Sequence, residues 1–221
     1  MAKGNFYLLC IAYKILDSKM ATVAQAVKAI SKAAKWSETD LRHRARWLIE
    51  AEEITPGKGG YGGAGAHKVN VKDLVTLILS MAVPVAKQAP RYIKKFRNLK
   101  TTEVDGLIWR LEDAMIDRIA FWGDLDRIKA SEVIITEFQL WFDEKSPEAN
   151  FIYEEKDRDD GVQTRLNFPS TPPKERIRTD LADCKMGIKF GPMLFYNLWL
   201  ILTGENPTTK KSSQRRKRAT K

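Results

Sequence analysis

Cysteine and histidine are scarce in this chain of 221 residues, and their scarcity limits the chemistry that it can support. The two cysteines, Cys10 and Cys184, lie far apart without CxxC or Cys/His spacing, so neither a disulfide framework nor a zinc site is indicated. The two histidines, His43 and His67, have no nearby nucleophile pattern such as GxSxG. We therefore expect no enzymatic activity, no metal and no cofactor, in a reducing, cytoplasmic compartment, or at the nucleoid if the source is prokaryotic.

Long hydrophobic runs are also missing. The two longest apolar stretches, residues 6–16 and 192–202, are each about a dozen residues and contain polar side chains, whereas a spanning helix needs roughly 20 apolar residues. We accordingly expect no association with a membrane. With 43% hydrophobic residues, the chain still has enough apolar surface to bury a globular core.

The formal net charge of +10 is distributed unevenly along the chain. Residues 19–100 carry 16 basic and 6 acidic side chains, and residues 208–221 carry 7 basic and no acidic ones. Residues 101–207 carry 13 basic and 21 acidic side chains, which is a net charge of −8. This pattern predicts one unit over 1–98, a second over 99–205 and a disordered basic tail over 206–221.

Apolar spacing and capping patterns predict three helices in the first unit. In residues 21–34 the apolar side chains recur every three or four positions, as on one face of a helix. Ser37 begins a capping-box pattern for a second helix over 38–52, and Asn70 begins another for a helix over Val71–Met81. The second helix carries four basic side chains on the faces that its apolar residues leave free: Arg42, His43, Arg44 and Arg46.

A glycine-rich stretch separates the second and third helices. Six of the nine residues from Gly57 to Gly65 are glycine, which frees the backbone for a tight turn. We interpret the stretch as a β-hairpin wing, and a merely flexible loop is the alternative. No GxxxxGK[ST] pattern and no preceding hydrophobic strand is present, which argues against a nucleotide-binding loop. Four side chains can reach outward from the wing: Lys58, Tyr61, His67 and Lys68.

Residues 21–81 resemble prokaryotic winged helix-turn-helix regulators in the order of their predicted elements. These elements are a helix, a capped arginine-rich helix, a glycine-rich hairpin and a further helix. The layout is similar to that of MerR-like proteins in its Leu41-Arg42 pair, Pro56 turn, wing and polar-capped helix at 70–74. The interval from Leu41 to Pro56 is longer than in that layout, so the resemblance is to the wider group, which includes DNA-binding proteins of phages and mobile elements. It implies double-stranded DNA as the partner.

The predicted DNA-contacting side chains come from the second helix and the wing. They are Ser37, Thr39, Arg42, His43, Arg44, Arg46, Lys58, Tyr61, His67 and Lys68. An arginine on a helix in the major groove can bind guanine bidentately or bind phosphate. The alternative interpretation of these arginines is that they form a solvated helix face without a partner. Residues 84–100 are basic and aromatic, and we interpret them as a linker or connecting helix close to nucleic acid.

The basic tail is expected to add nonspecific attraction to nucleic acid. Its charges are Lys210, Lys211, Arg215, Arg216, Lys217 and Arg218. A nuclear localisation signal or a solubilising end would have the same composition, so both alternatives stay open.

Residues 99–205 are predicted to form a small α+β domain with an antiparallel sheet. The predicted elements are a helix over 104–119, strands over 132–142, 150–153, 164–168 and 186–190, and a final helix over 192–202. The acidic charge of this unit repels phosphate, so we expect it to bind a protein partner or to self-associate. Its tryptophans are expected to be core or interface anchors: Trp109, Trp122, Trp141 and Trp199.

These patterns together favour a sequence-recognising DNA-binding protein, a transcriptional regulator whose second unit dimerises, binds a partner or senses a ligand. The first alternative is an accessory DNA-processing factor, for phage packaging, replication or excision, that recruits an enzyme. The second is a metal-dependent nuclease in which Asp157, Asp159 and Asp160 hold Mg²⁺. An exposed polar turn explains that acidic cluster better, because the cluster lacks the glycine spacing of a calcium loop.

Overall fold

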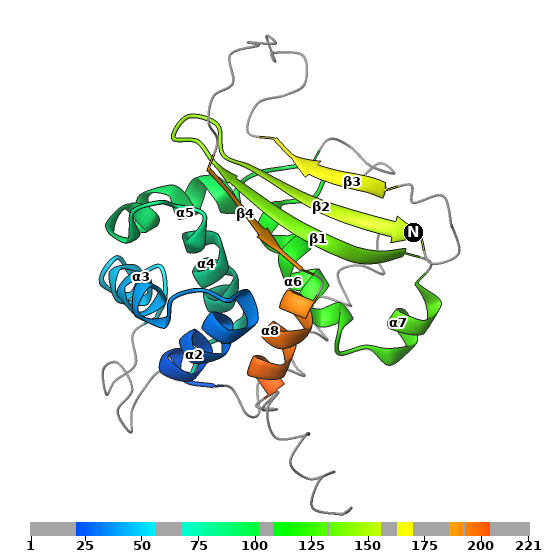
Figure 1. Cartoon of the computed structure of the whole chain (residues 1–221), viewed down its shortest axis with the longest axis horizontal. Coiled ribbons are helices and arrows are strands. Elements are labelled where there is room, and N and C mark those ends of the chain that lie inside the picture. Colours follow the sequence, from blue (N-terminus) through cyan, green and yellow to red (C-terminus); the bar gives the residue numbers. More distant parts are fainter. Residues whose placement is uncertain are drawn as a thin grey trace, which may run out of the picture.

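The computed structural model describes residues 21–55, 68–101, 108–131, 133–155, 163–169, 186–191 and 193–203. Over these residues the chain combines helices with a four-stranded antiparallel sheet, which confirms the expected α+β class. The helices are α2 (Val23–Ala34), α3 (Glu38–Glu50), α4 (Val71–Met81), a short 3₁₀ helix η1 (Ala86–Gln88), α5 (Ala89–Arg97), α6 (Leu111–Phe121), α7 (Leu125–Ala130) and α8 (Met193–Thr203). The strands are β1 (Val133–Phe142), β2 (Glu148–Glu155), β3 (Gln163–Phe168) and β4 (Met186–Phe190). Figure 1 shows α6 and α8 against one face of the sheet, with α2 to α5 gathered on their left.

The first two described helices are joined by a tight turn. The α2 helix ends at Lys35, whose φ of 52° and ψ of 42° lie in the left-handed region, and its N–H donates to the Ser31 carbonyl. This conformation turns the chain sharply, so that α3 begins after Ser37. The Ser37 hydroxyl accepts from the Asp40 N–H, as the capping pattern predicts. The Asp40 carboxylate does not complete the box, because it accepts from Trp36 and Arg44 instead.

The α4 helix lies at the centre of the helical part. Asn70 and Asp73 form a complete capping box at its start, which confirms the predicted third helix. Every residue of α4 except Lys72 is buried, and the helix contacts α3, α5 and α6. A helix covered on so many sides fixes the positions of its neighbours.

The sheet has the strand order β3-β2-β1-β4, and every neighbouring pair is antiparallel. All four predicted strands are confirmed, although β2 extends beyond the predicted 150–153 at both ends. One face of the sheet is aromatic, because Phe138 of β1 lies opposite Phe151 of β2 and Phe190 of β4. Phe195 of α8 packs on the same face, with its ring centroid 5.6 Å from that of Phe138. Burial of these rings attaches α8 to the sheet.

The helix predicted over 104–119 begins later than expected. Residues 108 and 109 are not helical, Arg110 is the N-cap of α6, and residues 104–107 lie outside the described ranges. Lys100 and Arg110 form an antiparallel bridge, and the Leu111 N–H donates to the Leu99 carbonyl. This pairing holds Arg110 in an extended conformation, where helical periodicity alone predicts a helix. The α7 helix that follows α6 was not predicted.

One hydrophobic core runs through both predicted units. The same cluster of buried side chains contains Val27 of α2, Leu77 of α4, Met115 of α6 and Phe138 of β1. The α2 helix contacts α8, and α4 contacts α6. The Tyr92 ring of α5 meets the Phe142 ring of β1 edge-on, with centroids 5.0 Å apart. Packing is therefore continuous across the boundary predicted between residues 98 and 99.

Gly187 of β4 is the cross-strand partner of Trp141 of β1. A methyl group at Gly187 would lie 2.3 Å from the Trp141 ring. We therefore expect Gly187→Ala to lower the free energy of unfolding by about 1–2 kcal/mol, because the indole must move. Gly191 has no atom within 4 Å of the same position, so Gly191→Ala is the matched control and should be near neutral. Urea denaturation of both variants checks this, and equal losses would contradict it.

Candidate nucleic-acid interface

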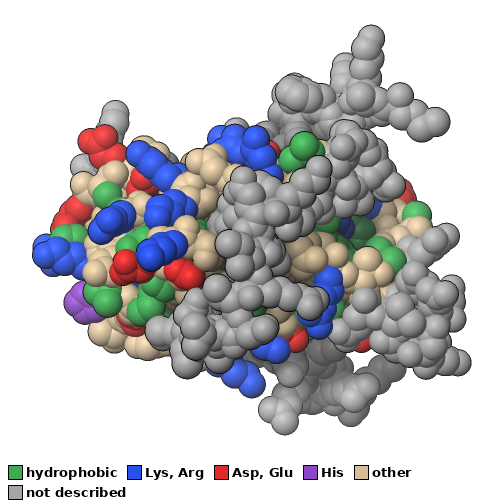
Figure 2. Space-filling model, turned by 90° about the horizontal axis from the view of Figure 1, so that it is seen from above, with side chains coloured by type: hydrophobic (Ala, Val, Ile, Leu, Met, Phe, Trp, Pro, Cys, Tyr) green, Lys and Arg blue, Asp and Glu red, His purple; other side chains and the backbone are tan. Residues whose placement is uncertain are grey.

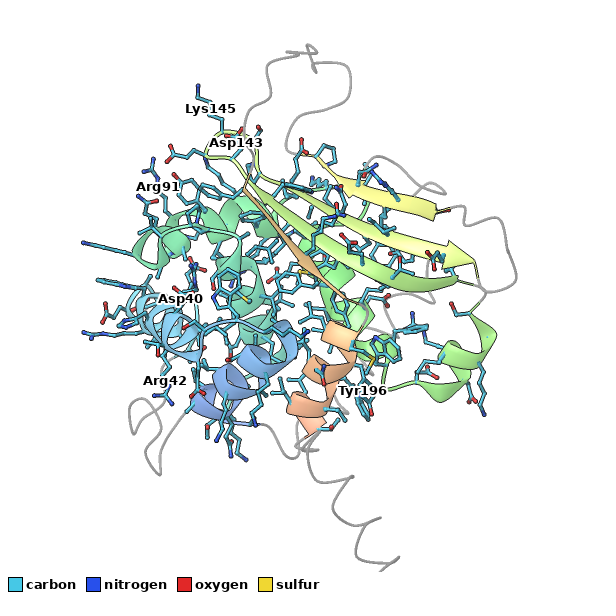
Figure 3. The ribbon with its side chains drawn as sticks, viewed as in Figure 1. Asp40, Arg42, Arg91, Asp143, Lys145 and Tyr196 are labelled. Carbon is cyan, nitrogen blue, oxygen red and sulfur yellow. The ribbon has the colours of Figure 1, made fainter. Side chains whose placement is uncertain are left out.

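Five of the predicted DNA-contacting side chains are solvent-exposed, four on one face of α3 and one at its N-cap. Leu41, Ala45 and Leu48 are buried, which turns the opposite face of the helix outward. The exposed predicted residues are Ser37, Thr39, Arg42, His43 and Arg46. Figure 3 shows Arg42 on α3, on the side of the molecule away from the sheet. This face is therefore accessible to a large partner.

Each exposed arginine of α3 pairs with a glutamate one helical turn away. Arg42 Nη2 lies 2.5 Å from Glu38 Oε1, and Arg46 Nε lies 2.7 Å from Glu50 Oε1. The two arginine side chains are 60% and 74% exposed. Exposed pairs of this kind contribute only about 0.3–0.5 kcal/mol, so either arginine can exchange its glutamate for another anion.

Arg44 does not share this exposed face, and that prediction is wrong. Its side chain is 2% exposed, with Nε donating to Asp40 Oδ2 at 2.5 Å. Its Nη1 donates to the carbonyls of Ser80 at 2.5 Å and Val83 at 2.7 Å. Ser80 lies in the last turn of α4 and Val83 lies just beyond its end, where a helix leaves backbone carbonyls without partners inside the helix. Arg44 donates to both carbonyls and so joins α3 to the end of α4.

The Asp40 carboxylate is the acidic partner in this cluster. Burial alone raises the pKa of Asp40, but the hydrogen bonds from Arg44 and Trp36 outweigh that effect and hold the pKa below its ordinary value of 3.8. The Trp36 Nε1 donates to the carboxylate at 2.6 Å, and the Arg44 guanidinium lies 5.9 Å from the Trp36 ring. Asp40 therefore keeps its negative charge and holds Arg44 against α3.

The low pKa of Asp40 predicts a pH dependence of stability. Because the pKa of Asp40 is lower in the folded than in the unfolded chain, the charged carboxylate stabilises the fold fully at pH values above the unfolded-state pKa. This stabilisation is lost as the pH falls through the folded-state pKa. We expect the stability difference between the wild type and Asp40→Asn to be constant above about pH 5 and to shrink below about pH 4. Urea denaturation at a series of pH values measures it. A difference that stays constant down to about pH 2 would contradict it.

The described residues fix both ends of the glycine-rich stretch. Residues 56–67, with the predicted Lys58, Tyr61 and His67, lie outside the described ranges. Ile54, before the stretch, is buried, and its N–H donates to the Leu48 carbonyl at the end of α3. Lys68, after it, is exposed and forms an antiparallel bridge with Thr22. The described residues before the stretch therefore lie at the end of α3, and those after it lie beside the start of α2.

A second basic surface lies on η1 and α5, which sequence reasoning identified only as a basic linker or connecting helix. Lys87, Arg91, Lys94 and Lys95 are exposed. The Lys87 Nζ lies 5.5 Å from the centroid of the Trp47 ring, which joins η1 to α3. Figure 2 shows lysine and arginine side chains gathered at the left end of the molecule, where Figure 1 places α3 and α5. The helical spacing of residues 91, 94 and 95 could have revealed this face from the sequence.

The other predicted features are placed only in part. The acidic cluster at 157–160 and the basic tail at 210–218 lie outside the described residues. Among the residues that the structure describes, no group of three or more His, Cys, Asp or Glu side chains could hold a metal ion. Trp109, Trp122 and Trp199 pack against the core, whereas Trp141 lies over Gly187.

Within the described ranges, no helix has the length and apolar character needed to span a bilayer. Comparison with protein-family models, with curated proteins and with solved structures finds no match for this chain. A functional assignment must therefore come from the residues and their arrangement.

Proposed function

We propose that this chain is a sequence-recognising protein that binds double-stranded DNA through α3, as a transcriptional regulator of the winged helix-turn-helix type. The observation that carries the proposal is the bridge between Thr22 and Lys68. The bridge sets Lys68, the first described residue after the glycine-rich stretch, beside the start of α2, which is where the end of a wing next to a pair of helices would lie. The tight turn at residues 35–37 between α2 and α3 supports the same interpretation.

The exposed stripe of α3 has the spacing and chemistry of a recognition surface. Thr39, Arg42, His43 and Arg46 follow the i, i+3, i+4, i+7 pattern of one helix face, and all four are exposed. Such a stripe is about 10 Å long at 1.5 Å per residue. The major groove is about 12 Å wide and admits one α-helix, whose arginines can bind guanine O6 and N7. The stripe thus offers hydrogen-bond donors along the length that a groove can read.

The proposal is tested by selecting sequences from a random duplex library with the full chain, followed by competition binding. We expect the wild type to enrich one sequence, and Arg42→Gln with Arg46→Gln to lose that preference. Each bidentate contact to guanine contributes about 1–3 kcal/mol of discrimination, so the double variant should bind the enriched site at least about 10-fold more weakly.

A charge-matched control is available on the sheet. Arg165 of β3 and Lys189 of β4 are exposed, and Arg165→Gln with Lys189→Gln removes the same two charges. This control should keep the sequence preference of the wild type. If no sequence is enriched over bulk DNA by the wild type, the proposed function is wrong.

A further inference from the structure

The positive charge of the helical part is concentrated on α5 rather than on α3. The α3 helix has three basic side chains, Arg42, Arg44 and Arg46, and three acidic ones, Glu38, Asp40 and Glu50. The segment formed by η1 and α5 has five basic side chains and no acidic one. A polyanion approaching this end of the molecule therefore meets a stronger positive field over α5 than over α3.

The outer face of α5 is formed by Arg91, Lys94 and Lys95, at the i, i+3, i+4 spacing of neighbours on a helix. All three are exposed, and the Lys94 side chain is 78% exposed. Arg91 and Lys95 flank the buried Tyr92, with Arg91 Cζ and Lys95 Nζ lying 5.5 Å and 5.3 Å from its ring centroid. In Figure 3 Arg91 extends from α5 at the edge of the molecule. The ring contacts hold two of the three charges in place on this face.

The internal contacts of these three side chains leave most of their donors available. Lys94 Nζ is 3.9 Å from the Glu53 carboxylate, which also binds Arg97 at 2.6 Å. Lys95 Nζ donates to the Glu144 carbonyl at 2.7 Å. A lysine ammonium has three donors and an arginine guanidinium has five, so these contacts do not exhaust them.

The apolar face of α5 is already used. Ala89, Tyr92, Ile93 and Phe96 are buried in the protein core. A basic amphipathic helix that binds a bilayer needs its apolar face free to enter the lipid. The surface left on α5 is polar and cationic, which suits a phosphate backbone rather than a membrane.

We infer that the outer face of α5 is a second DNA-contacting surface, which binds phosphates without regard to sequence while α3 discriminates between sequences. The inference rests on the proposed function, because it takes duplex DNA as the partner. The link between Lys87 and Trp47, together with the contact between α3 and α5, places the two surfaces at one end of the molecule. One duplex can therefore meet both.

The test measures binding of the full chain to random duplex DNA across a salt series. Each phosphate contact contributes about 0.9 to the slope of log K against log salt. With Arg91→Gln, Lys94→Gln and Lys95→Gln combined, we expect the slope to fall by about 2.7. The ratio of binding to the enriched site over random DNA should stay at the wild-type value. A variant that keeps the charges, Arg91→Lys with Lys94→Arg and Lys95→Arg, should retain the full slope.

The control removes three charges elsewhere: Lys129→Gln on α7, Arg165→Gln on β3 and Lys189→Gln on β4. If the α5 variant and this control change the slope equally, α5 is not a contact surface, although α3 can still recognise DNA. If the α5 variant loses the sequence preference but keeps the slope, the division between the two helices is wrong. If the wild type does not bind duplex DNA, or binds anionic vesicles instead, both the inference and the proposed function fail.

Discussion

Replacing Phe138 with alanine is expected to lower the free energy of unfolding by about 4 kcal/mol, because the ring lies at the centre of the aromatic face of the sheet. Phe138 is fully buried, and its ring is stacked with those of Phe151 and Phe190 at centroid distances of 4.6 Å and 5.9 Å. It also meets Phe195 of α8 edge-on. Alanine would leave a cavity between sheet and helix, which neighbours held by other contacts cannot fill. Urea denaturation followed by circular dichroism measures the loss.

The matched control is Phe121→Ala at the end of α6. Phe121 is only partly buried, and its ring contacts are with Trp122 and the Arg127 guanidinium. Its loss should cost less than about 2 kcal/mol, since less apolar area is removed from the interior. Because one core joins the helices to the sheet, Phe138→Ala should also speed amide exchange in α4 as well as in β1. Faster exchange confined to the sheet would contradict a shared core.

Arg44→Met is expected to lower the free energy of unfolding by about 3 kcal/mol, since it removes the hydrogen bonds of Arg44 to buried carbonyls and the cationic partner of Asp40. The carbonyls of Ser80 and Val83 would lose their Arg44 hydrogen bonds, and Asp40 would lose its cationic partner. For a chain of this size the midpoint of thermal unfolding should fall by roughly 6–12 °C. Differential scanning calorimetry of the variant checks the value.

Two further substitutions separate the geometry of Arg44 from its charge. Arg44→Lys keeps the charge, but one ammonium cannot reproduce the fork that reaches Asp40 and α4 together, so we expect a smaller but clear loss. Arg42→Met removes a charge from the exposed face of the same helix and should cost less than about 0.5 kcal/mol. If Arg44→Met and Arg42→Met were equally stable, the buried contacts would not hold α3 in place.

The elements that were predicted correctly are those whose signals are local. Ser37 and Asn70 each accept a backbone N–H at the start of a helix, and such caps can be recognised within a few residues of sequence. The first two strands were predicted from runs rich in apolar and aromatic side chains on either side of the Ser146-Pro147 turn. The start of α6 was missed because the pairing of Lys100 with Arg110 depends on a contact between segments, which periodicity does not contain.

The candidate site was predictable only as far as exposure follows from helical spacing. Arg42 and Arg46 lie where the apolar residues of α3 predict a solvent-facing side, and both are exposed. The assignment of Arg44 to the same side is wrong, because Arg44 lies three residues after Leu41 and four before Leu48, within the buried stripe of α3. What the sequence of α3 could not show is the acceptors of Arg44, which are the carbonyls of Ser80 in α4 and of Val83 just beyond it.

The continuous core has a practical consequence for any attempt to divide the chain. A recombinant fragment that ended near residue 100 would keep α2, α4 and α5 but remove α6, α8 and β1, which cover their inner faces. Apolar surface bared in this way recruits chaperones, attracts proteases and promotes aggregation. The helical half therefore shares its core with the sheet, α6 and α8, and we do not expect it to fold as a separate fragment.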